Sequence, residues 1–175
     1  MRKTFLDSSD DEPDKEDEPN TRKFKIIVIG DKKVGKTSFI QRLHSDQFSI
    51  QYSETRTIEI YNSCPLGDIE VDIWDVPPNV CKFYNVQTLK SDAILVMFDS
   101  DKMNSLSNST ELYKCIREKI YIDTVPNLWF VYRGTTEVKQ IEYCHPDRLF
   151  HIDNMSKDGI FDLIYDIRCK LLNML

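Results

Sequence analysis

Two glycines, a lysine and a threonine occur at a spacing that suits phosphate binding. The chain reads Gly30-x-x-x-x-Gly35-Lys36-Thr37, directly after a mostly apolar run and directly before an amphipathic segment. Glycines allow a tight turn whose N–H groups surround phosphate oxygens, the lysine adds a positive charge, and the hydroxyl can hold Mg²⁺. An apolar strand before the loop and a helix after it favour a phosphate-binding loop over a turn without a ligand.

Apolar patterns predict the elements that would position this loop. They predict strands near 24–30, 56–63, 69–75, 92–99, 127–133 and 148–152, and helices near 36–45, 79–90, 103–120 and 159–173. The short connection 64–68 makes the second and third strands a hairpin, whereas the other strands alternate with helices. The expected fold is α/β, with a mostly parallel six-stranded sheet, one antiparallel edge strand, helices on both faces, and ligand at the carboxyl ends of the strands.

Composition limits the class of protein. Residues 7–20 hold eight carboxylates and one lysine, so the remainder of this chain of net charge −6 carries about +1. We expect an acidic disordered arm (1–21) and one folded domain (22–175), with no nucleic-acid surface. The five cysteines are scattered, which indicates reduced thiols and no metal cluster, and no apolar run approaches the roughly 20 residues of a membrane span.

Further strings along the chain resemble the Ras superfamily of small GTPases, with most similarity to the Rab and Ran branches. The resemblance is carried by Gly30–Ser38, then by Phe48, Tyr52 and Thr55, then by Asp72–Asp75 and Ala93–Asp99. It extends over nearly all of 24–175 and implies a P-loop small-GTPase fold that binds GTP or GDP with Mg²⁺.

The resemblance also implies roles for individual residues. The implied Mg²⁺ ligands are Thr37, Thr55 and Asp75, and Thr57 competes with Thr55 for the threonine of the first switch. Residues implied in nucleotide binding are Gly30, Asp31, Lys32, Lys33, Val34, Gly35, Lys36, Thr37, Ser38, Phe48, Thr55, Arg133, Ser156 and Lys157. Lys32 and Lys33 replace small residues of the relatives, and they could either attract a triphosphate or crowd it.

The second switch departs from the family pattern. Where the family has Asp-x-x-Gly-Gln, this chain has Asp75-Val76-Pro77-Pro78-Asn79. Proline has no N–H, so Pro78 cannot donate to a γ-phosphate as the family glycine does. Asn79 is the remaining candidate catalytic residue, and its side chain is one methylene shorter than the family glutamine. We therefore expect slow or absent GTP hydrolysis.

The base-recognition motif departs as well. The family has Asn-Lys-x-Asp, whose aspartate accepts hydrogen bonds from guanine, and this chain has Tyr132-Arg133-Gly134-Thr135. Glu137 comes two residues too late, while Arg133 or Tyr132 could stack on a base of any identity. Met155-Ser156-Lys157 resembles the Ser-Ala-Lys string of relatives. Guanine selectivity is therefore in doubt.

Two functions remain open. The first is a monomeric GTP-binding switch or effector-binding module with weak or absent hydrolysis, whose first switch contacts a protein effector or regulator. The second is a pseudo-GTPase scaffold that binds proteins without using nucleotide, and a kinase or other ATP user ranks below both. The last four residues contain no cysteine for prenylation, so we expect no membrane anchor, as in Ran, and a cytoplasmic or nuclear location.

Overall fold

The computed structural model describes residues 23–49, 51–83, 91–117, 127–141 and 148–174. The predicted acidic arm therefore lies outside the described residues, as do the ends of the helices predicted at 79–90 and 103–120. Among the described residues, no helix has the length and apolar character needed to cross a membrane.

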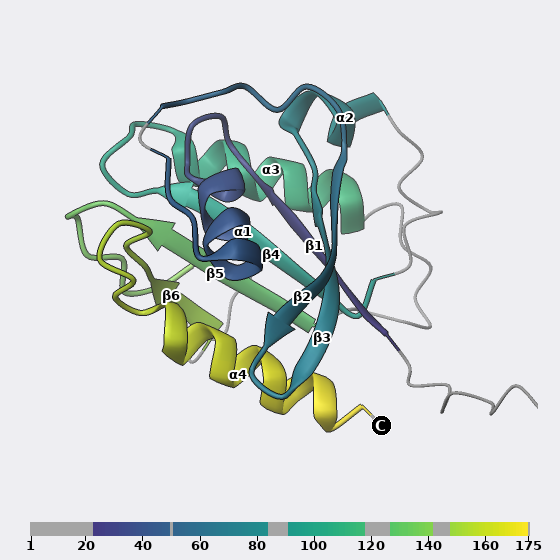
Figure 1. Cartoon of the computed structure of the whole chain (residues 1–175). Helices are drawn as coiled ribbons and strands as arrows, with labels where there is room; N and C mark the ends of the chain where they lie inside the picture. Colours follow the sequence, from purple (N-terminus) through teal and green to yellow (C-terminus); the bar gives the residue numbers. More distant parts are fainter. Residues whose placement is uncertain (1–22, 50, 84–90, 118–126, 142–147, 175) are drawn as a thin grey trace, which may run out of the picture.

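Six strands form one sheet in the order β2-β3-β1-β4-β5-β6 (Figure 1). Their bounds are Phe24–Gly30 (β1), Glu59–Leu66 (β2), Ile69–Asp75 (β3), Ala93–Asp99 (β4), Asn127–Arg133 (β5) and Leu149–His151 (β6). Neighbouring strands are parallel except for the hairpin of β2 and β3, which is antiparallel. The predicted α/β fold with one antiparallel edge strand is confirmed.

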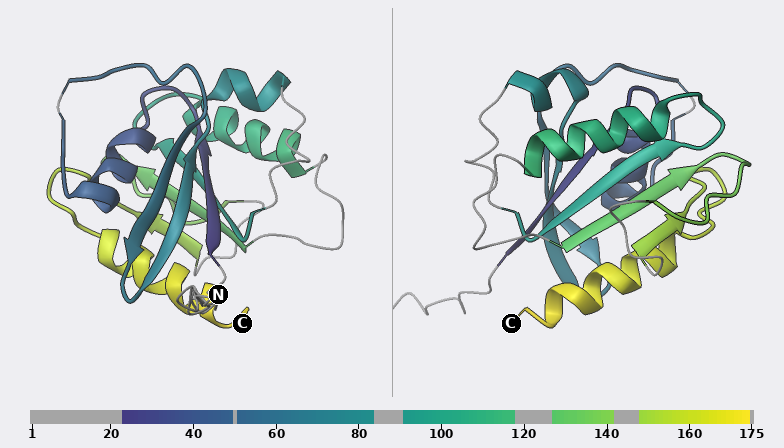
Figure 2. Two further views of the ribbon diagram at one scale, coloured as in Figure 1. Left: turned by 45° about the vertical axis from the view of Figure 1, so that its right-hand side comes forward. Right: turned by 180° about the vertical axis from the view of Figure 1, so that it is seen from behind.

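Helices cover both faces of this sheet, because alternate residues of the central strands point to opposite sides. The helices are Lys36–Ser45 (α1), Pro78–Phe83 (α2), Ser105–Arg117 (α3) and Ile160–Leu172 (α4). Ile26 and Val28 of β1 pack in one buried cluster with α1 and α4, whereas Ile27 and Ile29 pack in the other with α2 and α3. Figure 2 shows α3 lying across the face opposite α1. Burial on both faces explains why β1 and β4 read as nearly continuous apolar runs.

The hairpin differs from its predicted position. Strand β2 continues to Leu66, beyond the expected end at 63, and the turn is Gly67-Asp68 instead of 64–68. Cys64 and Leu66 are fully buried and lie opposite Val71 and Ile69, and this burial extends the pairing past a proline. Pro65 is tolerated because β2 is an edge strand, where a missing N–H need not interrupt the sheet.

Gly30 lets β1 pass unusually close to β4. A Cβ added at Gly30 would lie 2.0 Å from the carbonyl oxygen of Met97, a contact that no larger residue could make without moving the strands. The first glycine of the motif is thus required by the sheet as well as by the turn that follows it.

Candidate functional site

A cavity of about 1030 Å³ opens at the carboxyl ends of the parallel strands. Its walls come from residues 32–38 after β1, 48–49 and 51–55 after α1, 77–79 after β3, and three stretches at the ends of β4 (Asp99, Asp101 and Lys102), β5 (133–135) and β6 (151–155). This is the edge of the sheet at which the sequence predicts a ligand, and the volume suits a small-molecule ligand. Gly30 and Asp31 are not among the lining residues.

The glycine loop (residues 30–37) wraps around the ammonium group of Lys36. Lys36 is 8% exposed, and its Nζ donates hydrogen bonds to the carbonyl oxygens of Gly30 (3.1 Å) and Asp31 (2.9 Å). Gly35 has a φ of 93° and accepts the first backbone bond of α1, from the N–H of Phe39 (2.9 Å). A positive side chain at a helix N-terminus lined by a glycine turn fits phosphate oxygens.

Thr37, Thr55 and Asp75 meet beside this loop. Thr37 Oγ1 donates to Asp75 Oδ2 (2.5 Å) and lies 2.9 Å from Thr55 Oγ1. Asp75 is fully buried, and among the described residues its Oδ1 has no hydrogen-bond partner. Burial raises the pKa of the Asp75 carboxyl, although the hydrogen bond from Thr37 and the charge of Lys36 act in the opposite direction.

These three side chains fit a magnesium ion. The unpartnered carboxylate oxygen needs a cation or donor, and hydroxyl and carboxylate oxygens are the ligands that Mg²⁺ prefers. Thr57 is exposed and does not line the cavity, so the geometry favours Thr55 over its competitor. No cluster of three His, Cys, Asp or Glu side chains suitable for a metal occurs in the part of the chain that the structure describes. Phosphate and water would therefore have to complete the coordination.

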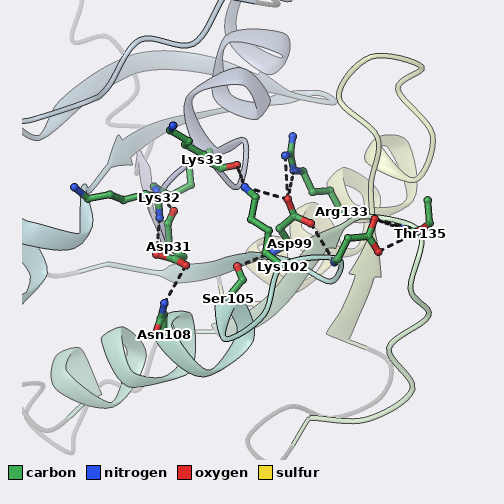
Figure 3. A network of polar contacts seen from close by, with 11 residues as sticks. Asp31, Lys32, Lys33, Asp99, Lys102, Ser105, Asn108, Arg133 and Thr135 are labelled. Atoms are coloured by element: carbon green, nitrogen blue, oxygen red, sulfur yellow. Dashed lines mark hydrogen bonds and ion pairs between the residues drawn. The ribbon is translucent and has the colours of Figure 1, made fainter.

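Lys32 and Lys33 contact the first-switch segment (residues 51–56). Lys32 Nζ donates to Glu54 Oε1 (3.0 Å), and Lys33 Nζ lies 5.1 Å from the ring centroid of Tyr52. The adjacent Asp31 turns toward α3, where its carboxylate accepts from Asn108 Nδ2 at 3.1 Å (Figure 3). In this structure the two lysines hold the first-switch segment against the glycine loop.

The second-switch segment (residues 75–79) runs from the end of β3 into the first turn of α2. Pro78 is the first residue of α2, a position where a missing N–H costs the helix nothing. Asn79 lines the cavity, and its Nδ2 donates to the carbonyl oxygen of Arg56 (3.4 Å). The amide that would have to orient water is thus engaged with the first-switch segment.

The predicted base contacts divide into two groups. Phe48 and Arg133 line the cavity as expected, and the Arg42 guanidinium lies 5.3 Å from the Phe48 ring centroid. Tyr132 does not line it, because its buried ring stacks on Phe98 with centroids 5.5 Å apart. Glu137, considered as a late substitute for the family aspartate, is exposed and pairs with Lys139 (3.7 Å).

Of the string Met155-Ser156-Lys157, Met155 alone lines the cavity. Ser156 and Lys157 are outside the cavity lining, and Lys157 Nζ pairs with Asp46 Oδ1 (2.6 Å) at the end of α1. Asn154 and Met155 line the cavity instead, and Asn154 Nδ2 donates to the carbonyl oxygen of Gly35 (3.1 Å). The fold brings the side chain of Asn154, which the sequence comparison did not single out, against the glycine loop.

Sequence reasoning also missed Asp99, Asp101 and Lys102. These residues line the cavity from the end of β4 and the loop after it. A signal was available, because polar residues that directly follow a buried parallel strand lie at the ligand-binding edge of the sheet.

The sheet order, the glycine loop and Lys36 at the start of α1 define a P-loop domain of the small-GTPase type. The model of the family described as "Roc: Ras of Complex, Roc, domain of DAPkinase" matches residues 25–127, which is more than half of the chain. The chain belongs to this family, within the Ras superfamily of small GTPases.

Individual relatives agree with this assignment. Ras-related protein Rab-7L1 of Homo sapiens is 31% identical over 111 residues, which cover 59% of this chain and 53% of that protein. Ras-related protein RabY of Dictyostelium discoideum is 31% identical over 103 residues (54% and 43%). An ADP-ribosylation factor-like protein of the same organism is 25% identical over 135 residues (67% and 70%). The chain spans about half the length of the Rab-related proteins it matches.

Proposed function

We propose that this chain binds GTP or GDP with Mg²⁺ and acts as a regulatory module with weak or absent GTP hydrolysis. The observation that supports this most directly is the meeting of Thr37, Thr55 and Asp75 beside the Lys36 loop, with a buried Asp75 oxygen that none of the described residues bonds. Lys36 would hold the outer phosphates, and the three oxygen-bearing side chains would hold Mg²⁺, which would supply charge neutralisation.

Weak hydrolysis follows from the second-switch segment. Pro78 offers no N–H to a γ-phosphate, and the Asn79 amide is short and engaged with the carbonyl oxygen of Arg56. We expect the double variant Pro78→Gly with Asn79→Gln to release phosphate faster than the wild type in single-turnover assays. The same phosphate release from both proteins would show that another defect controls the rate.

We further propose that a protein effector or regulator binds at the first-switch segment. Tyr52 is 52% exposed, and the neighbouring Glu54 and Arg56 are also exposed and of opposite charge. A pseudo-GTPase scaffold is the second candidate. It is favoured by one observation, that Lys36 and Lys32 already pair with protein groups that could replace a phosphate ligand.

Nucleotide content separates the two candidates. The protein is purified in Mg²⁺ and denatured, and the released nucleotide is identified by chromatography. We expect near-stoichiometric GTP or GDP from the wild type and none from Lys36→Ala. Lys139→Ala is the matched control, because Lys139 is an exposed lysine outside the cavity lining. An empty wild-type protein whose melting temperature does not change with GTP, GDP or ATP would favour the scaffold.

A further inference from the structure

Asp99, Lys102 and Arg133 form a charged network beside the glycine loop (Figure 3), and all three line the cavity. Asp99 is 5% exposed, and its Oδ2 accepts from Arg133 Nε (3.1 Å) and Nη2 (3.0 Å). Lys102 Nζ lies 3.2 Å from the same oxygen and donates to the carbonyl oxygen of Lys33 (2.8 Å). The Asp99 carboxylate is therefore already paired with two cations of the protein, Arg133 and Lys102.

Asp101 also accepts hydrogen bonds from several groups of the protein. Its carboxylate accepts from the N–H of Thr135 (2.8 Å), the N–H of Thr136 (2.9 Å) and the hydroxyl of Thr136 (2.8 Å). The Thr135 hydroxyl adds a fourth donor at 3.2 Å. A carboxylate offers about four lone-pair sites, so these donors occupy its accepting capacity.

The other carboxylates that line the described part of the cavity are also paired. Glu54 accepts from Lys32, and Asp153 Oδ1 accepts from the N–H of Met155 (2.7 Å). Asn154 Oδ1 has no partner among the residues that the structure describes, but the atom is buried and the Nδ2 of the same amide is bonded to Gly35. A guanine edge presents two neighbouring donors, N1–H and N2–H. Asp99 and Asp101, the carboxylates beside Arg133 and Thr135, have their accepting sites filled by donors of the protein and are not available to that edge.

We propose that the cavity selects its ligand by the polyphosphate and Mg²⁺ and not by the base, so that nucleoside triphosphates bind as a class. This inference rests on the proposed function and goes beyond it in naming which ligands compete. The base would lie against Arg133 and Phe48, both of which line the cavity. Stacking on a guanidinium or aromatic face tolerates every base.

The test is a binding panel on the full chain freed of nucleotide, measured by calorimetry in Mg²⁺ with GTP, ATP, UTP and inorganic tripolyphosphate. A site that reads a base edge by hydrogen bonds can discriminate by about 10⁴-fold, so we expect the three nucleotides to fall within about tenfold of one another. Lys36→Ala should abolish binding of the three nucleotides.

Arg133→Lys tests the stacking surface, because it keeps a cation for Asp99 but removes the planar group. We expect an equal loss of affinity for the three nucleotides and no change for tripolyphosphate. Arg148→Lys is the matched control, since the Arg148 guanidinium lies over Trp129, outside the cavity lining.

The outcomes separate the two levels of the proposal. GTP binding more than about tenfold tighter than both ATP and UTP, and dependent on Lys36, would overturn base tolerance while the proposed function stands. If Arg133→Lys lost affinity for GTP but not for ATP or UTP, base tolerance would be overturned as well. The absence of Lys36-dependent binding for every nucleotide would overturn the proposed function and the inference together.

Discussion

Replacing Asp75 by asparagine should have opposite effects on the free protein and on the loaded one. Asp75 is a fully buried carboxylate with one oxygen that has no hydrogen-bond partner in the described part of the chain, and Glu59 lies opposite it on β2. The variant Asp75→Asn keeps an acceptor for the Thr37 hydroxyl and removes the buried charge. The free protein should therefore become more stable, and Mg²⁺-dependent nucleotide binding should be lost.

The magnitudes follow from these contacts. A buried polar group without a partner costs about 1–3 kcal/mol, and the asparagine N–H keeps part of that cost, so we expect a gain of about 1 kcal/mol. In a domain of this size that gain raises the melting temperature by about 2–4 °C. Saturating ligand at a hundred times its dissociation constant would stabilise the wild type by about 2.7 kcal/mol, and this gain should be absent in the variant.

Thermal denaturation with and without Mg²⁺ and GTP measures both effects in one experiment. Asp72→Asn is the control, because Asp72 is on the same strand but accepts from the N–H of Ser63 (3.1 Å), outside the cavity lining. That variant should keep the ligand-induced rise. The reasoning is refuted if Asp75→Asn melts below the wild type without ligand, or if it keeps the wild-type rise with Mg²⁺ and GTP.

Three further predictions concern the loops around the cavity. Gly30→Ala should destabilise the protein by about 3 kcal/mol or more in urea unfolding, because its Cβ would meet the carbonyl oxygen of Met97 at 2.0 Å; wild-type stability would contradict the close packing. Hydrogen bonds from Thr135 and Thr136 lower the pKa of Asp101 to about 2, so the stability it adds is complete above pH 3.8 and lost as pH falls through 2. The melting temperatures of wild type and Asp101→Asn should converge over that range, and a constant difference would exclude the assigned cause. Lys32→Ser should speed hydrogen exchange at residues 51–56 in low salt and not in high salt, because the Glu54 pair is exposed and screened; equal exchange at low salt would show that this pair does not hold the segment.

Local pattern was sufficient to predict most of the fold. Strands β1 and β4 are buried on both faces and therefore read as apolar runs that no surface element would show. The extension of β2 past Pro65 was missed because proline normally ends a strand, and only the edge position of β2 makes it acceptable. Register at this end is decided by burial of Cys64 and Leu66, which a single sequence does not reveal.

Site residues that lie in one short segment could be predicted from the sequence. Contacts between segments far apart in the sequence could be predicted less well. Spacing alone pointed to Lys36 and Thr37, and the structure brings Thr55 and Asp75 to them. The partners of Lys32 lie 22 residues away, in a segment whose path no local pattern encodes. The same limitation hid Asn154, because only the folded chain shows its side chain against Gly35.

The contacts of the first-switch segment with the glycine loop should control how fast a nucleotide binds and dissociates. Lys32 with Glu54, Lys33 with Tyr52, and Thr37 with Thr55 join this segment to the glycine loop, so a ligand bound beneath the segment would enter and leave when these contacts open. Association should then reach a ceiling set by the opening step, however concentrated the nucleotide is. The same closed segment would retard departure, so a loaded molecule should keep its ligand for long periods. A regulator that displaced residues 51–56 from the glycine loop would speed both the binding and the release of the nucleotide.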